Sequence, residues 1–76
     1  MNNVTIAASG LRLTASVVVT ERERRGLSQT ALAGLLGVHP SYVSLLEAGK
    51  RQPDYGIVER MATLFSVPVH SLTSAT

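Results

Sequence analysis

The chain has 76 residues, a length that allows one domain with a small core. Seven lysine and arginine residues and five acidic residues leave a formal net charge of only +2. The absence of cysteine excludes a disulfide framework and a thiolate metal site. No stretch of the sequence is long and apolar enough for a membrane helix, and no secretion signal is visible, so we expect a cytoplasmic protein without membrane contact.

The N-terminal part of the chain begins with a polar segment. Residues 1–10 are small, polar and β-branched, which predicts a flexible N-terminal arm. A first helix is expected over residues 11–25. Its start is open, since Ser9 and Thr14 are both suitable caps and the three valines at 17–19 are poor helix formers.

Two short helices joined by a glycine turn follow. Ser28 is a good N-cap for a helix over residues 29–36, and Gly37 suits the left-handed conformation that ends a helix. Pro40 is favoured at the first position of a second helix, which runs to about residue 47. This arrangement predicts a helix-turn-helix, with a plain αα-hairpin without a ligand as the alternative.

The C-terminal part of the chain predicts one longer helix and a final turn. Asp54 is the expected N-cap of a helix over residues 55–65. Its apolar stripe consists of Tyr55, Val58, Met61, Ala62 and Phe65. Pro68 can open a last short helical turn that ends at Leu72, and residues 73–76 are expected to form a tail. The sequence therefore predicts an all-α domain of five helices over residues 11–72.

The spacing of this central segment is similar to that of a known family. The matching positions are Gly26-Leu27-Ser28-Gln29, Leu32-Ala33, Gly37-Val38, Val43-Ser44, Glu47, Gly49-Lys50-Arg51 and Pro53. This pattern resembles the lambda-repressor/Cro-like (XRE-type) helix-turn-helix regulators over roughly residues 18–72. The resemblance implies a compact five-helix domain that binds double-stranded DNA. One departure is Glu21, where the family usually has an apolar residue.

The residues that could read bases lie on one side of the second helix of the motif. In the family this helix enters the major groove. Val43 and Leu46 are expected to point inward, which leaves an outer, base-reading face of His39, Pro40, Ser41, Ser44 and Leu45. Leu45 suits contact with a thymine methyl group, or it is a scattered surface leucine. His39 is expected to be a helix cap or a DNA contact.

A second set of residues is expected to contact phosphates. It consists of Ser28, Gln29, Arg24, Arg25, Tyr42, Lys50 and Arg51. Gln29 resembles the family's backbone-binding glutamine, and a helix N-terminus offers free amides to an anion. Tyr42 has the alternative of packing on the domain surface. Arg22 and Glu47 resemble a structural ion pair that recurs in the family.

Catalysis is not expected from this sequence. The only histidines, His39 and His70, have no second ligand at metal spacing and no nucleophile partner. No glycine-rich nucleotide loop is present. We therefore expect no enzyme activity, no metal, no cofactor and no small-molecule ligand.

The expected function is binding of a palindromic operator by a homodimer that represses or activates transcription. Ile57, Leu64 and Val69 are apolar in addition to the stripe that is expected to form the core. These three residues and His70 are therefore predicted to form a dimer interface. The rival is a protein-interaction module, antitoxin-like or partner-binding, in which the same fold binds DNA weakly or not at all.

Overall fold

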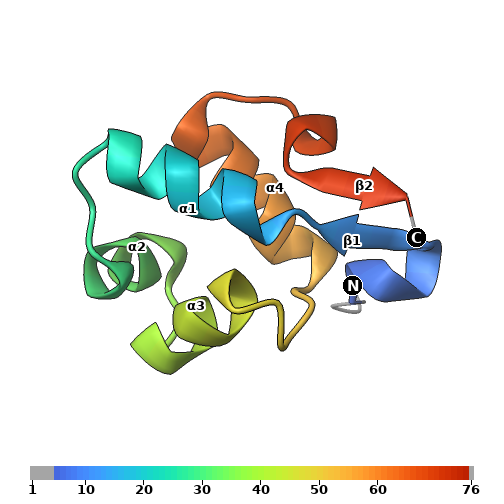
Figure 1. Cartoon of the computed structure of the whole chain (residues 1–76), viewed down its shortest axis with the longest axis horizontal. Coiled ribbons are helices and arrows are strands. Elements are labelled where there is room, and N and C mark those ends of the chain that lie inside the picture. The colour runs from blue at the N-terminus through green and yellow to red at the C-terminus, as the bar shows by residue number, and fades with distance from the viewer. Residues whose placement is uncertain (1–4, 76) are drawn as a thin grey trace.

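A computed structural model describes residues 5–75 of the chain, and Figure 1 shows its arrangement. Its elements in chain order are η1 (Ile6–Ser9), β1 (Leu11–Leu13), α1 (Ala15–Arg24), α2 (Gln29–Leu36), α3 (Pro40–Glu47), α4 (Tyr55–Phe65), η2 (Val69–Ser71) and β2 (Thr73–Ala75). Here η denotes a short 3-10 helix. None of the helices formed by residues 5–75 has the length and apolar character that a membrane crossing requires.

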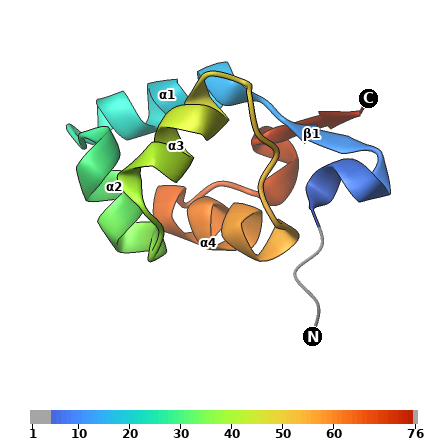
Figure 2. The same ribbon diagram turned by 90° about the horizontal axis from the view of Figure 1, so that it is seen from below.

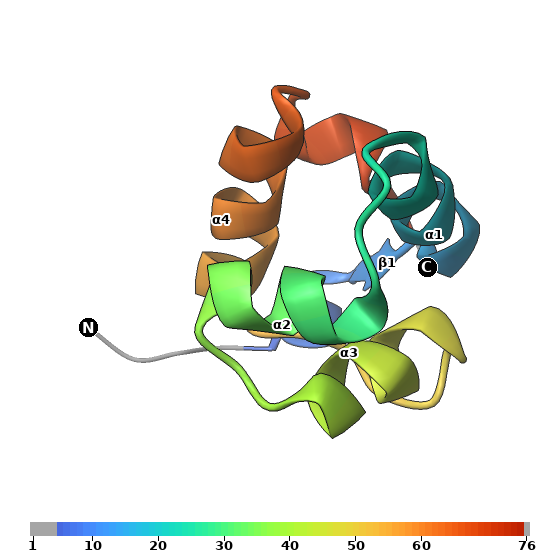
Figure 3. The same cartoon turned by 90° about the vertical axis from the view of Figure 1, so that its left-hand side faces the viewer.

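Local capping explains the two helices of the motif, whose predicted bounds are confirmed. The Ser28 hydroxyl accepts a hydrogen bond from the Ala31 backbone N–H at 3.0 Å and so starts α2. Gly37 ends α2 in the left-handed conformation at φ 73°, and Pro40 takes the first position of α3. In Figures 1 and 3, α2 and α3 lie together on one side of the domain, below α1.

The core sits between the four α-helices and is closed at one end by η1, β1 and Leu72. Its buried apolar residues are Ile6, Leu13, Val18, Leu32, Ala33, Leu36, Val43, Leu46, Val58, Met61, Ala62, Phe65 and Leu72. Helix α4 supplies four of them, as its stripe predicts. The fifth predicted member is wrong, because Tyr55 is 42% exposed at the first position of the helix.

The N-terminal segment differs from the predicted arm over its described part. Ile6 is only 1% exposed, and its backbone N–H donates to the Pro53 carbonyl at 2.9 Å. Thr5 forms an isolated antiparallel bridge with Asp54. Residues 1–4 of the predicted arm lie outside the described residues. Residues 5–10 are thus part of the domain, since a buried isoleucine side chain contributes to its core.

A small sheet replaces both the start of the predicted first helix and the predicted tail. Strand β1 pairs antiparallel with β2 in the register Leu11↔Ala75, Arg12↔Ser74 and Leu13↔Thr73. The Thr14 N–H donates to the Leu72 carbonyl at 2.8 Å and continues this pairing. Helix α1 therefore starts after Thr14. The predicted last turn is present as the short 3-10 helix η2, with Pro68 as its N-cap and Leu72 as its C-cap, so the count of five helices is not confirmed for residues 5–75. The fold is mostly helical, with four α-helices and one two-stranded sheet.

The loop between α3 and α4 links the helix-turn-helix to this sheet. In Figure 2 it runs past the end of the molecule that carries β1 and η1. The Gln52 side-chain oxygen accepts from the Leu13 backbone N–H at 2.8 Å. Pro53 is buried and its carbonyl accepts from Ile6. The position of this loop is therefore set by the N-terminal segment.

Candidate nucleic-acid interface

Helix α3 presents one side to solvent. Val43 and Leu46 are each 1% exposed and hold the helix against the core. On the opposite side, Ser41, Ser44 and Leu45 are exposed and Pro40 is half-buried. The predicted base-reading residues of α3 therefore share one accessible helix face.

The N-cap of α3 is a histidine, which is an uncommon residue for this role. The Nδ1 atom of His39 accepts from the Ser41 backbone N–H at 3.1 Å. The same ring nitrogen lies 2.8 Å from the Ser41 hydroxyl oxygen. Both side chains are exposed. Of the two roles expected for His39, the geometry shows the cap, and the ring stands at the end of α3 that would point into a groove.

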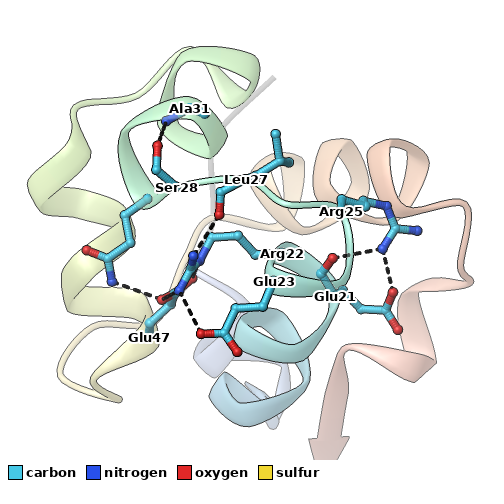
Figure 4. A network of polar contacts seen from close by, with 9 residues as sticks. Glu21, Arg22, Glu23, Arg25, Leu27, Ser28, Ala31 and Glu47 are labelled. Atoms are coloured by element: carbon cyan, nitrogen blue, oxygen red, sulfur yellow. Dashed lines mark hydrogen bonds and ion pairs between the residues drawn. The ribbon is translucent and has the colours of Figure 1, made fainter.

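An ion pair joins α1 to the end of α3 (Figure 4). Arg22 Nε donates to one oxygen of Glu47 at 2.7 Å and Arg22 Nη2 to the other at 3.0 Å. The side chains are 12% and 5% exposed, so the pair is largely removed from water. Hydrogen bonding to Glu47 raises the pKa of the Arg22 guanidinium.

The same network reaches the start of α2. Arg22 Nη1 donates to the Leu27 carbonyl at 2.8 Å (Figure 4), and the Gln29 amide donates to Glu47 Oε1 at 2.9 Å. One N–H of the Gln29 amide is thus used inside the protein, and the other has no partner among residues 5–75. Because Glu47 is held by residues of α1 and α2, this network fixes the orientation of α3 relative to both helices.

The loop after α3 carries two exposed cations. Lys50 and Arg51 are exposed and form no ion pair with a carboxylate of residues 5–75. The Arg51 guanidinium lies over the Tyr42 ring, 4.7 Å from its centroid. Stacking of this kind positions the cation without neutralising it. Both loop cations remain available to an external anion.

Tyr42 has a role within the fold. Its ring is partly buried and packs against the core. Burial raises the pKa of the Tyr42 hydroxyl, while a hydrogen bond with the Asp54 backbone acts in the opposite direction. The hydroxyl therefore lies beside the start of α4. Tyr42 holds the loop and supports Arg51, in agreement with the packing alternative.

Arg25 is also used within the fold. It donates to Glu21 Oε1 at 2.6 Å (Figure 4) and to the Phe65 carbonyl, and it lies 4.8 Å from the centroid of the Phe65 ring. This arginine joins the ends of α1 and α4, where Ser66 adopts the left-handed conformation at φ 56°. Glu21, the departure from the family pattern, is its partner. Arg24 remains 67% exposed, 3.6 Å from Glu21.

Comparison with known proteins agrees with this geometry. A family model described as a helix-turn-helix domain matches residues 20–74. The chain belongs to the XRE-type helix-turn-helix family of DNA-binding regulators. Among solved structures it is similar to the restriction-modification controller protein C.AhdI from Aeromonas hydrophila, with 30% sequence identity and a TM-score of 0.67. The match covers 74% of this chain and 81% of that chain. No curated protein matches the chain.

Two polar residues of this XRE-type domain were not predicted from the sequence. Arg60 of α4 donates to the Leu36 carbonyl at 2.6 Å and so satisfies the end of α2. Gln52 fixes β1, as described above. Neither has a local spacing signal, because each partner lies 24 or more residues away in the chain. The contact of Arg60 follows one general tendency, because cationic side chains often bind the free carbonyl groups at the end of a helix.

The predicted dimer residues are less exposed than expected. Ile57, Leu64 and Val69 are partly buried and pack against the core, whereas His70 is exposed. The large exposed apolar residues are instead Leu35 (55%), Leu45 (38%) and Tyr55 (42%). Ile57, Leu64 and Val69 therefore contribute both to the core and to the surface formed by α4 and η2.

Proposed function

We propose that this protein is a sequence-specific transcriptional regulator that inserts α3 into the major groove of duplex DNA. The observation that carries the proposal is the exposed outer face of α3, flanked by two sets of groups suited to phosphates. On one side are the first-turn amides of α2 and the free N–H of Gln29. On the other side are Lys50 and Arg51.

The electrostatics of α3 favour approach to DNA. Its only acidic residue, Glu47, is 5% exposed and bound by Arg22 and Gln29. A carboxylate neutralised in this way adds little repulsion toward phosphates, because its charge is compensated at 2.7 Å. The helix therefore offers hydroxyl groups and an apolar side chain to the bases, while the cations lie beyond its C-terminal end.

We further propose that two copies bind a palindromic operator. A single helix-turn-helix covers one half-site, and half-sites one helical turn apart require two recognition helices about 34 Å apart. The side formed by α4 and η2, with Ile57, Leu64, Val69 and His70, is the proposed contact between copies. Similarity to a restriction-modification controller supports a regulatory role.

Binding to random duplex DNA over a range of salt concentrations tests the proposed function. We expect affinity to fall steeply with added salt, with a log–log slope of about −0.9 for each phosphate contacted. Fluorescence polarisation of a labelled duplex measures this slope. Absence of binding at low salt, or a flat salt dependence, would contradict DNA binding and favour the protein-interaction module. Sedimentation on a selected operator should give two chains per duplex, and one chain would contradict the dimer.

Leu45 gives a prediction about base reading with a matched control. Leu45→Ala is expected to reduce discrimination at one thymine-containing base pair by about 1 kcal/mol, because a methyl contact is lost while the fold is kept. Leu35→Ala removes a leucine of α2 that is more exposed than Leu45 and lies outside the reading face, and it should leave sequence preference unchanged. Competition binding against operator variants measures both. Equal effects of the two substitutions would mean that Leu45 does not touch a base.

A further inference from the structure

The hydrogen bonds at the N-cap of α3 determine which way the Ser41 hydroxyl points its proton. Two groups of Ser41 lie within hydrogen-bond distance of His39 Nδ1, the backbone N–H at 3.1 Å and the side-chain oxygen at 2.8 Å. A backbone N–H can only donate, so Nδ1 must act as an acceptor. An Nδ1 atom that carried a proton would place two N–H groups against each other.

The direction of the hydrogen bond between His39 Nδ1 and the Ser41 side-chain oxygen, which lie 2.8 Å apart, then follows. Two lone pairs at this distance repel each other, so one proton must lie between Nδ1 and the Ser41 oxygen. Because Nδ1 carries no proton, the proton belongs to the Ser41 hydroxyl, which donates it to His39. The neutral imidazole ring accordingly carries its own proton on Nε2.

These bonds give the two exposed side chains fixed and opposite hydrogen-bonding characters. The hydroxyl proton of Ser41 is already donated to His39, so Ser41 can offer DNA only the acceptor lone pairs of its oxygen. His39 offers DNA only the Nε2–H donor. A free serine, in contrast, can either donate or accept and so distinguishes poorly between bases.

We propose that Ser41 is a specificity-determining residue that selects a base with an exocyclic amino group, adenine or cytosine, in the major groove. Adenine N6 and cytosine N4 are the only base donors in that groove, whereas guanine and thymine present acceptors to it. His39 is the positioning residue that sets this selectivity. The inference rests on the proposed function, since it assumes that α3 enters the major groove.

Ser44 provides a control on the same helix face. It is exposed, and its hydroxyl forms no hydrogen bond with another described residue. Ser44 can therefore rotate its hydroxyl to suit a donor or an acceptor. Selectivity for amino groups is expected at the base pair read by Ser41 and not at the base pair read by Ser44.

The experiment begins with an operator selected from random duplexes by the wild-type protein. The base pair that loses its preference in Ser41→Ala identifies the contact. At that position, purine in place of adenine, or 2-pyrimidinone in place of cytosine, removes only the amino group. We expect this replacement to weaken wild-type binding by about three- to tenfold and to have no further effect in Ser41→Ala. A 7-deazapurine in the same base pair removes the N7 acceptor and should affect both proteins equally.

Variants of His39 separate positioning from helix stability. Asparagine is a strong N-cap whose side-chain oxygen can accept both Ser41 donors, so His39→Asn should keep the selectivity for amino groups. His39→Ala frees the hydroxyl and should relax discrimination at the Ser41 base pair alone. A purely structural role of His39 would instead lower binding to all sequences alike.

The outcomes distinguish this inference from the proposed function. The inference alone would be overturned if the protein still selects an operator but Ser41→Ala changes only the effect of the 7-deazapurine, or changes the effect of no base analogue. Unchanged discrimination in His39→Ala would overturn the positioning role of His39. A protein that binds no duplex at low salt would overturn the proposed function together with the inference.

Discussion

Glu47→Ala is expected to destabilise the domain by about 3–5 kcal/mol, the largest effect of any single polar substitution that we expect. The substitution leaves the Arg22 guanidinium, only 12% exposed, without its carboxylate partner. A buried charge without a partner costs more than the intact pair contributes. Single domains are commonly stable by about 5–15 kcal/mol, and a short chain lies toward the lower end, so much of the variant should be unfolded at 37 °C. Urea denaturation followed by far-UV circular dichroism measures the change.

Two controls accompany this substitution. Glu23 lies 3.9 Å from the same arginine, but its side chain is 67% exposed, so Glu23→Ala should change stability by less than about 1 kcal/mol. The double variant Arg22→Met/Glu47→Leu removes both charges and should recover most of the stability lost in Glu47→Ala. A cost of Glu47→Ala as small as that of Glu23→Ala would show that the pair is not buried in solution.

The ion pair also connects stability to the proposed DNA contact. Glu47 is the last residue of α3, and its carboxylate binds one residue of α1 and one of α2. A helix of eight residues is too short to be stable alone, so its orientation depends on such contacts and on its buried face. We infer that loss of Glu47 would disorder the reading face before it unfolded the core of the domain.

Local signals explain why the helix-turn-helix was predictable. The bounds of α2 and α3 agree with those expected from capping residues and the glycine turn. The bounds of α4 also agree with the prediction, although Asp54 at its N-cap forms no side-chain hydrogen bond with the first turn. Each of these signals acts within one or two turns of its own helix. The Arg22–Glu47 contact came only from the family resemblance, because 25 residues separate its partners. No periodicity reports on such a contact.

Long-range pairing explains what was missed. Strands β1 and β2 have three residues each and pair with each other, although they lie far apart in the chain. Segments this short carry no alternation that distinguishes a strand from a frayed end. The sequence also did not reveal which arginines bind other residues of the domain and which remain available to DNA. Arg25 binds the carbonyl of Phe65, 40 residues away, whereas Arg51 stacks on Tyr42 and keeps its charge available.

Reversal of both loop charges is expected to cause the largest loss of DNA binding. In the variant Lys50→Glu/Arg51→Glu, four units of charge change beside the proposed phosphate contacts. Each unit is worth on the order of 1 kcal/mol at 4 Å in water, so affinity for any duplex should fall by roughly a hundredfold to a thousandfold at low salt. The slope of affinity against salt should also shrink by about one unit for each cation lost. Polarisation titrations of random and operator duplexes measure both quantities.

The matched comparison separates contact from general charge. Arg12 is exposed on β1 and forms no side-chain hydrogen bond within residues 5–75, so Arg12→Glu changes the net charge by two units, as much as either loop substitution does alone. Arg12→Glu should weaken binding only through the overall field and leave the salt slope nearly unchanged. Because neither loop cation touches a base in this arrangement, the ratio of operator to random affinity should be similar in all of these variants. An unchanged slope in Lys50→Glu/Arg51→Glu, or a collapse of that ratio with general affinity retained, would show that the loop after α3 does not bind the DNA backbone.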